Sequence, residues 1–186
     1  MISTGDLKRG VVIEMDKQLF SVVEFQHLKI GRGSAQVRMK LRNVRSGAVI
    51  DRTVQAGEKW PRVRIEHQGV QYLYADPPNH VFMDQETFEQ MTLTPDQLGD
   101  AVNYLKDGLE LELLMYGDEP IGVELPITIQ LKIADTEPGF RGDTATGGTK
   151  PATLETGLVV NVPLFVNSGE TIKVDTRDGT YVERVS

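Results

Sequence analysis

Residues 27–45 read HLKIGRGSAQVRMKLRNVR, and the second half of this stretch decides the fold of the chain around it. Apolar and polar residues alternate there from Ala35 to Arg42. A period of two is that of a β-strand with one face toward a core, so the segment predicts a half-buried strand. The exposed face is basic, because the stretch holds six lysines and arginines and no acid in a protein with a net charge of -7.

A glycine-flanked arginine precedes this strand, since Arg32 stands between Gly31 and Gly33. One interpretation is a glycine-rich hairpin turn with a solvated arginine. The other is a probe, because the glycines leave space around a planar guanidinium whose donors suit phosphate oxygens and base edges. A basic hairpin on an acidic protein favours the probe and predicts contact with a polyanion at one spot. At the hairpin base, His27 would orient the tip or contact RNA, or would form a local hydrogen bond as an ordinary strand residue.

Charge divides the chain into three parts. Residues 1–63 contain 12 lysines and arginines and 6 acids, a net charge of +6. Residues 64–126 carry a net charge of -11, and residues 127–186 carry one of -2. Such asymmetry predicts separate modules with different surfaces. The acids of residues 84–124 are spread over predicted strands and a helix, so we interpret them as a solvated face and not as an acid–base pair.

Short strands separated by turns are predicted in all three parts. Those in the first part cover residues 10–15, 19–25, 34–44 and 48–54. Those in the middle part cover residues 70–75, 80–84, 109–114 and 121–125, and those in the last part cover 127–133, 157–166, 169–175 and 181–182. Many short strands with glycine-rich turns are typical of small barrels. The predicted fold class is therefore all-β, with an SH3-like or KOW-like barrel at 1–63 followed by OB-type barrels at 64–126 and 127–186.

One helix is predicted in the middle part. Thr94 suits its N-cap, Pro95 its first position and Gln97 the third position of a capping box. The helix is expected to stop at Gly108, because glycine is typical just beyond a helix end. The residues that it would turn inward are Leu98, Ala101, Val102 and Leu105.

The sequence does not contain the residues that several classes of function require. The chain has no cysteine and three histidines without metal-ligand spacing, so no metal site is expected. It has no glycine-rich nucleotide cradle and no nucleophile elbow, so neither a cofactor nor an enzyme activity is expected. Because it also lacks a long apolar run and a secretory signal, we expect a cytoplasmic protein without membrane contact.

A second candidate site is the polar, glycine-rich loop from Pro138 to Pro151. Its small donors and two flanking cations suit contact with a nucleic-acid backbone or with base edges. The alternative is a flexible linker within a barrel. The loop residues that we single out are Arg141, Gly142, Asp143, Thr144, Gly147, Gly148 and Lys150.

The last third of the chain resembles the elongation factor P family of bacterial translation factors. The C-terminal signature of that family is Lys-x-Ala, four residues, Gly, two residues, an aliphatic, x, Val-Pro, two residues, an aliphatic, two residues and Gly. The residues that fill it here are Lys150, Ala152, Gly157, Val160, Val162, Pro163, Val166 and Gly169. Residues 27–43, 142–144 and 174–182 resemble the family as well, so the similarity covers the whole chain.

The resemblance implies three barrels arranged as an L, similar in shape to a tRNA, and we expect a monomer. It implies a factor that binds the 70S ribosome and its rRNA beside the P-site peptidyl-tRNA. There it would stimulate peptide-bond formation at consecutive prolines by positioning alone. Arg32 would reach the CCA end of the tRNA, and the loop at 138–151 would lie near the exit-site codon of the mRNA. The residues implied to support the tip and contact RNA are His27, Lys29, Gly31, Gly33, Ser34, Arg38, Lys40 and Arg42.

The tip departs from the pattern of the family. Many members have a modified lysine within Pro-Gly-Lys-Gly, and members with arginine are rhamnosylated, typically within Pro-Gly-Arg-Asn. Here the tip reads Ile-Gly-Arg-Gly, so a lysine-directed modification is ruled out. Arg32 is rhamnosylated, otherwise modified by an Arg32-modifying enzyme, or used bare. The competing function is a general RNA-binding or chaperone module built from OB-type barrels. The lack of aromatic residues from Ser34 to Val44 argues against it.

Overall fold

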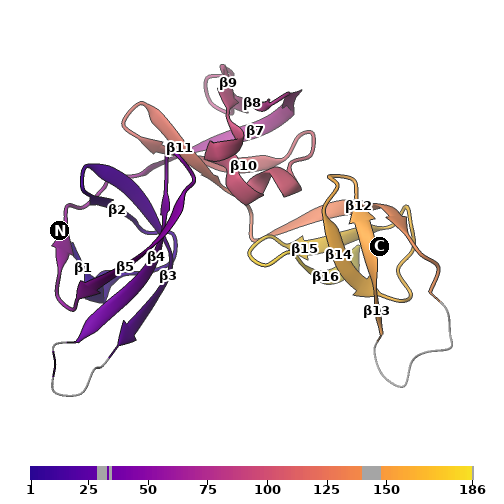
Figure 1. Ribbon diagram of the computed structural model, residues 1–186. Helices are drawn as coiled ribbons and strands as arrows, with labels where there is room; N and C mark the ends of the chain where they lie inside the picture. The colour runs from indigo at the N-terminus through magenta and orange to yellow at the C-terminus, as the bar shows by residue number, and fades with distance from the viewer. Residues whose placement is uncertain (29–32, 34, 140–147, 186) are drawn as a thin grey trace. The chain divides into compact units, whose positions relative to one another are not determined.

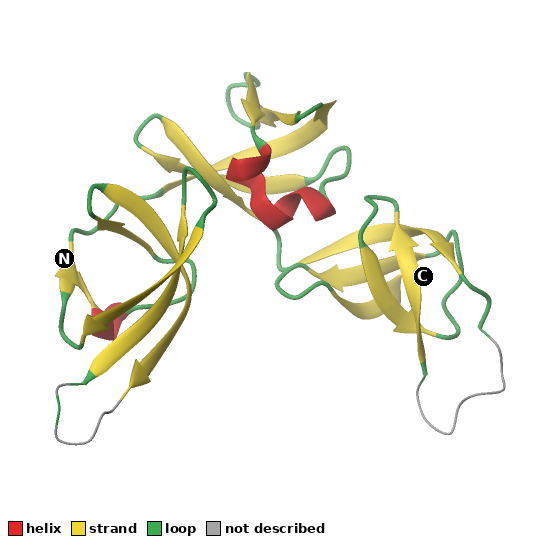
Figure 2. Ribbon diagram, in the orientation of Figure 1, coloured by secondary structure: helices red, strands yellow, loops and turns green. Residues whose placement is uncertain are grey.

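The computed structural model describes residues 1–28, 33, 35–139 and 148–185, and strands dominate this part of the chain (Figures 1 and 2). The all-β fold class predicted from the sequence is confirmed. The chain divides into two compact units. The first consists of Met1–Gln68, Thr94–Gly99 and Leu113–Gly122, and the second of Gly69–Leu93, Asp100–Glu112 and the chain from Val123 onward.

The N-terminal barrel belongs to the first unit. Its strands are β1 (Ile2–Ser3), β2 (Val12–Met15), β3 (Gln18–Leu28), β4 (Gln36–Asn43), β5 (Val49–Gln55) and β6 (Lys59–Trp60), with a 3-10 turn, η1, at Thr4–Asp6. A sheet in the order β2-β3-β4-β5 and a two-stranded sheet of β1 and β6 form its wall. The alternation predicted for β4 is confirmed, because Val37, Met39 and Leu41 are completely buried while Arg38 and Lys40 are exposed.

A β-bulge sets the phase of β3. Its pairing with β4 shifts between Val22 and Glu24, so that Val23 has no partner and lies 40% exposed. A bulge adds one residue to a strand and therefore exchanges the two faces beyond it. Phe25 consequently faces the core opposite Met39, whereas Glu24 faces outward opposite Lys40. The bulge thus gives the outer face of the hairpin its polar residues on both strands.

The middle sheet has the order β11-β10-β7-β8-β9. Its strands are β7 (Glu66–Asp76), β8 (Asn79–Asp84), β9 (Gln90–Leu93), β10 (Glu110–Tyr116) and β11 (Glu119–Glu124). The strands predicted at 70–75 and 80–84 are confirmed, and they form an antiparallel hairpin of β7 with β8. Strand β9 was not predicted. It pairs with β8 and places Leu93 in the core.

The helix begins as predicted but ends much earlier. The amide of Gln97 donates to the Thr94 hydroxyl, and the Gln97 side chain accepts from the Thr94 amide at 2.9 Å, so the capping box is confirmed. The predicted continuation to Gly108 is wrong, because α1 spans only Pro95–Leu98 and is followed by a 3-10 segment, η2 (Gly99–Tyr104). Gly99 adopts φ 54° and ψ -134°, a conformation that breaks the α-helix and that side-chain-bearing residues rarely adopt. Of the residues expected to face inward, Leu98, Ala101 and Leu105 are buried and Val102 is half-buried.

The C-terminal barrel belongs to the second unit. Its strands are β12 (Thr128–Thr136), β13 (Thr149–Leu154), β14 (Val159–Pro163), β15 (Thr171–Asp175) and β16 (Thr180–Val185). They form one sheet in the order β14-β13-β12-β15-β16, and the two edge strands contact each other, which closes the barrel. The prediction that the polar loop extends to Pro151 is wrong, because β13 starts at Thr149 and pairs with β14.

An ion pair in the C-terminal barrel predicts acid sensitivity. Arg177 donates to the Asp175 carboxylate from its backbone amide, Nε and Nη2, the last at 2.6 Å, and these bonds lower the pKa of Asp175 to about 2. The ionised form is thus favoured in the folded state, and its contribution to stability is complete above an unfolded-state pKa of about 3.9. It is lost as pH falls toward 2.

We therefore expect the difference in free energy of unfolding between the wild type and Arg177→Gln to shrink as the pH is lowered from about 5 to about 2. Urea titrations at several pH values measure this difference. Lys8→Gln is the control, because it removes the same charge from an exposed site in the N-terminal barrel. A difference that stays constant over this range would contradict the assignment.

Candidate nucleic-acid interface

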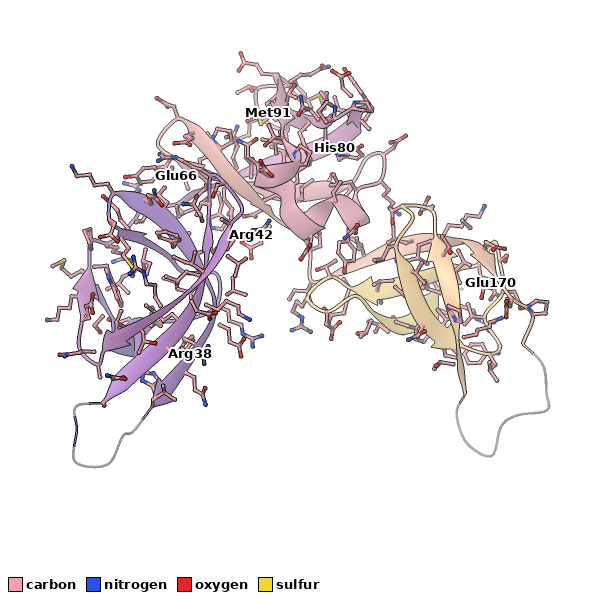
Figure 3. All side chains as sticks on the ribbon, viewed as in Figure 1. Arg38, Arg42, Glu66, His80, Met91 and Glu170 are labelled. Carbon is pink, nitrogen blue, oxygen red and sulfur yellow. The ribbon has the colours of Figure 1, made fainter. Side chains whose placement is uncertain are left out.

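The outer face of β3, β4 and β5 carries the basic residues of the hairpin. Arg38, Lys40 and Arg42 follow one another on this face of β4, because they occupy alternate positions of the strand. Figure 3 shows Arg38 toward the start of β4 and Arg42 farther along the strand. The strand register gives each of the three a different pair of neighbours, so their electrostatic surroundings differ.

Arg38 has neutral neighbours on both sides. It lies opposite Gln26 of β3 and Thr53 of β5, and its side chain is exposed. A guanidinium with no carboxylate opposite it keeps its donors for an external anion. Of the three cations, Arg38 is therefore best placed to contact a phosphate.

Lys40 lies between two acids. Glu24 of β3 and Asp51 of β5 are its partners in the register, so the row is acidic, basic and acidic across the sheet. Opposite charges on neighbouring strands attract each other and weaken the field that an external phosphate would meet. Together with Arg38 and residues of β3, this row lines a surface hollow of about 250 Å³. Its mixed charge makes Lys40 a poorer phosphate contact than Arg38.

Arg42 packs on backbone and not toward solvent. A Cβ atom built on Gly99 would lie 2.2 Å from Nη2 and 2.5 Å from Nη1 of Arg42, which shows how closely the guanidinium covers this glycine. A Cβ atom built on Gly47 would lie 3.9 Å from the same Nη2, so this glycine also faces the guanidinium of Arg42. Arg42 is half-buried, and both glycines belong to the same unit.

The last cation of the basic stretch, Arg45, is paired. Its Nε donates to Oε1 of Glu119 at 2.9 Å and its Nη2 donates to Oε2 at 2.8 Å. These bonds raise the pKa of Arg45 and lower that of Glu119. The two residues are 74 positions apart in the sequence, and nothing in the local pattern of either one indicated the pair.

His27 lies at the far end of β3, opposite Val37 on the core side of the sheet. Its ring is exposed and meets the ring of Phe25 edge-on, with centroids 5.9 Å apart. The histidine thus extends the apolar row of Phe25 toward the hairpin end. Its contact with RNA stays a prediction.

The tip itself is only partly covered by the structure. Gly33 is an exposed bend. The other tip residues that the sequence singles out lie outside the described residues, and so do most of those in the polar loop. They are Lys29, Gly31, Arg32 and Ser34 in the tip, and Arg141, Gly142, Asp143, Thr144 and Gly147 in the loop.

Lys150 closes the neck of the polar loop. It is buried, with 6% exposure, and its Nζ donates to the carbonyl of Glu137 at 2.6 Å. The Thr136 hydroxyl reaches across the same neck to the carbonyl of Pro151 at 2.8 Å. Sequence reasoning treated Lys150 as a surface contact, whereas its amine joins the two chain segments that flank the loop. Gly148 lies beside it and is half-buried.

The part of the chain that the structure describes has neither a cluster of metal-ligating residues nor a membrane-spanning helix. Its His, Asp and Glu residues form no group of three or more that could hold a metal ion. No helix in the same residues is long and apolar enough to cross a membrane.

The chain is similar to known proteins over nearly its whole length. Three family models match successive parts of the chain: the elongation factor P KOW-like domain at residues 3–60, the OB domain at 65–123 and the C-terminal domain at 129–184. A curated relative from Pelotomaculum thermopropionicum, named Elongation factor P, is 54% identical over 185 residues and covers 100% of both chains. Relatives of the same name from Moorella thermoacetica and Carboxydothermus hydrogenoformans are 55% and 53% identical, over 99% and 100% of this chain and 100% of each relative.

Proposed function

Because this chain belongs to the elongation factor P family, we propose that it binds the 70S ribosome beside the P-site peptidyl-tRNA and relieves stalling at consecutive prolines. The observation that carries this proposal is the match of all three family models in order, with about 54% identity to whole curated relatives. The chain is a translation elongation factor, and the proposed partners of its basic hairpin are tRNA and rRNA. A free monomer in the cytoplasm is part of the same proposal.

The proposed mechanism is physical positioning. Proline reacts slowly in peptide-bond formation because its ring restricts φ and removes a donor. Holding the P-site tRNA and the nascent chain in a productive geometry lowers the entropic part of the barrier. Arg32 would contact the CCA end, bare or modified, and the groups that carry out the chemistry would be those of the ribosome.

The polar loop of the C-terminal barrel is proposed to lie near the exit-site codon of the mRNA. The described residues on either side of this loop are joined, because the buried amine of Lys150 donates to the carbonyl of Glu137.

A reconstituted translation system tests the proposal. The wild-type protein is expected to raise the full-length yield of a reporter with three consecutive prolines. A matched reporter in which alanines replace the prolines should respond little, because its peptide bonds form without assistance. Equal responses of both reporters, or no response of either, would refute the proposed function.

Arg38 and Lys40 are expected to contribute unequally to ribosome binding. Removing a phosphate contact lowers the slope of log affinity against log salt concentration by about one. Arg38→Gln should show this change, whereas Lys40→Gln should show a smaller one because Glu24 and Asp51 already offset the lysine charge. Binding titrations at several salt concentrations measure both slopes. Equal slopes for the two variants would show that the flanking acids do not matter.

A further inference from the structure

We propose that Arg42 and Arg45 are positioning residues that fix the direction of the basic hairpin, and that they do not contact RNA. This inference rests on the proposed function, because a fixed direction matters only if the hairpin must reach a defined target. It concerns contacts within the first unit, between the N-terminal barrel and the segments 94–99 and 113–122. We call the group of Arg42, Arg45, Gly99 and Glu119 the latch.

The first contact of the latch is between the guanidinium of Arg42 and the backbone of Gly99. Arg42 covers Gly99 so closely that no side chain fits between them, as the distances of 2.2–2.7 Å from a built Cβ atom to its guanidinium atoms show. Gly99 also has a positive φ of 54°, which residues with side chains rarely adopt, and any larger residue here would displace the flexible end of Arg42 from the backbone. A planar, weakly hydrated guanidinium is well suited to lie against backbone in this way.

The second contact is the two-bond pair of Arg45 with Glu119 on β11. The amide of the Gln97 side chain donates to the carbonyl of Pro120 at 2.8 Å, which connects α1 to the same strand. The surfaces that receive Arg42 and Arg45 are therefore held to each other. Bidentate pairing adds directional constraint even where an exposed pair contributes little free energy.

An apolar cluster lies with the latch. Val12 and Leu19 of the N-terminal barrel are buried together with Ile121 of β11. Val44, which lies in sequence between the two arginines of the latch, packs against them. The other partly buried residues of this cluster are Val63, Ile65, Leu114 and Tyr116. The apolar contacts thus hold the N-terminal barrel against β11, and the two arginines restrict the orientation of the barrel on this surface.

The two ends of β4 thus have different tasks. The end near Arg38 presents a cation with neutral residues directly opposite it, whereas the end near Arg42 is anchored. The strand has eight residues and is about 25 Å long. A rotation of about 5° at the anchored end would move the hairpin end by about 2 Å, and a misplacement of about 1 Å can reduce a positioned reaction about a hundredfold.

Salt dependence separates positioning from RNA contact. Arg42→Gln should leave the slope of log ribosome affinity against log salt unchanged, while the maximal stimulation of the triple-proline reporter falls roughly threefold or more. Arg38→Gln is the reference for a phosphate contact and should lower the slope by about one. Arg64→Gln removes a charge from an exposed pair with Glu66 and should change neither quantity. A slope lowered by about one in Arg42→Gln would overturn the inference.

A measurement on the free protein keeps this test independent of the proposed function. The chain has no cysteine, so spin labels can be attached at Glu58→Cys and Asp118→Cys, two exposed sites of the first unit. The distance distribution between the labels should broaden in the Arg42→Gln/Glu119→Gln double variant and stay narrow in Arg38→Gln. An unchanged width in the double variant would refute the latch. If the wild type fails on the triple-proline reporter, the proposed function fails, and the label distances still decide whether the latch exists.

Discussion

Arg32→Ala is expected to lose most of the stimulation that the wild-type protein gives to the triple-proline reporter. The arginine stands alone between two glycines, so no adjacent side chain could replace the contact with the tRNA end that we propose for it. The variant removes a planar group that offers several donors at once. The measurement is the yield of full-length reporter at a protein concentration that saturates the ribosome, so that a loss of affinity is not mistaken for a loss of stimulation.

Arg32→Lys is the matched comparison, because it keeps the charge and removes the planar fork. We expect partial activity if the contact is electrostatic and little activity if the fork, or a group attached to it, is required. Intact mass measurement of the natively purified protein identifies any such group, since a deoxyhexose adds a defined mass. Full activity of Arg32→Ala would contradict a role of the tip in stimulation.

Phe82→Ala is expected to lower the free energy of unfolding by about 3–5 kcal/mol. Phe82 is completely buried on β8, between β7 and the edge strand β9, and its ring centroid lies 5.3 Å from that of Tyr72. Removing it takes away apolar contacts and leaves a cavity that close-packed neighbours fill only partly. Urea titrations followed by fluorescence or circular dichroism measure the change.

Phe88→Ala provides the control with the same substitution at another site of the second unit. Phe88 is 69% exposed, so its truncation is expected to change the free energy of unfolding by no more than about 0.5 kcal/mol. A loss below about 1 kcal/mol in Phe82→Ala would mean that the core around Tyr72 rearranges to fill the space.

The sequence predicts best the features that depend on neighbouring residues. The alternation of β4 and the capping box at Thr94 each follow from a local rule, and both are present. The error in the helix also has a local cause, because the glycine at position 99 was a visible signal that the apolar spacing outweighed. Strand β13 was missed because Pro151 lies within it, although there the proline pairs with Asn161 of β14.

The candidate site could be predicted only in outline. The basic hairpin and its outward cations follow from period and charge. What distinguishes Arg38 from Lys40 is the identity of the residues opposite them, which requires the register of three strands. The pair of Arg45 with Glu119 requires the positions of segments 74 residues apart, and no pattern within either segment contains that information.

The bulge at Val23 separates two parts of the hairpin. Before it, β3 pairs with both β2 and β4, whereas beyond it β3 pairs with β4 alone and has its two faces exchanged. The inside and outside of residues 24–28 and 36–40 are therefore fixed by their pairing with each other and not by β2. A change at the tip that preserves this pairing, such as one between arginine and lysine, would then leave the core residues of the barrel on their own side.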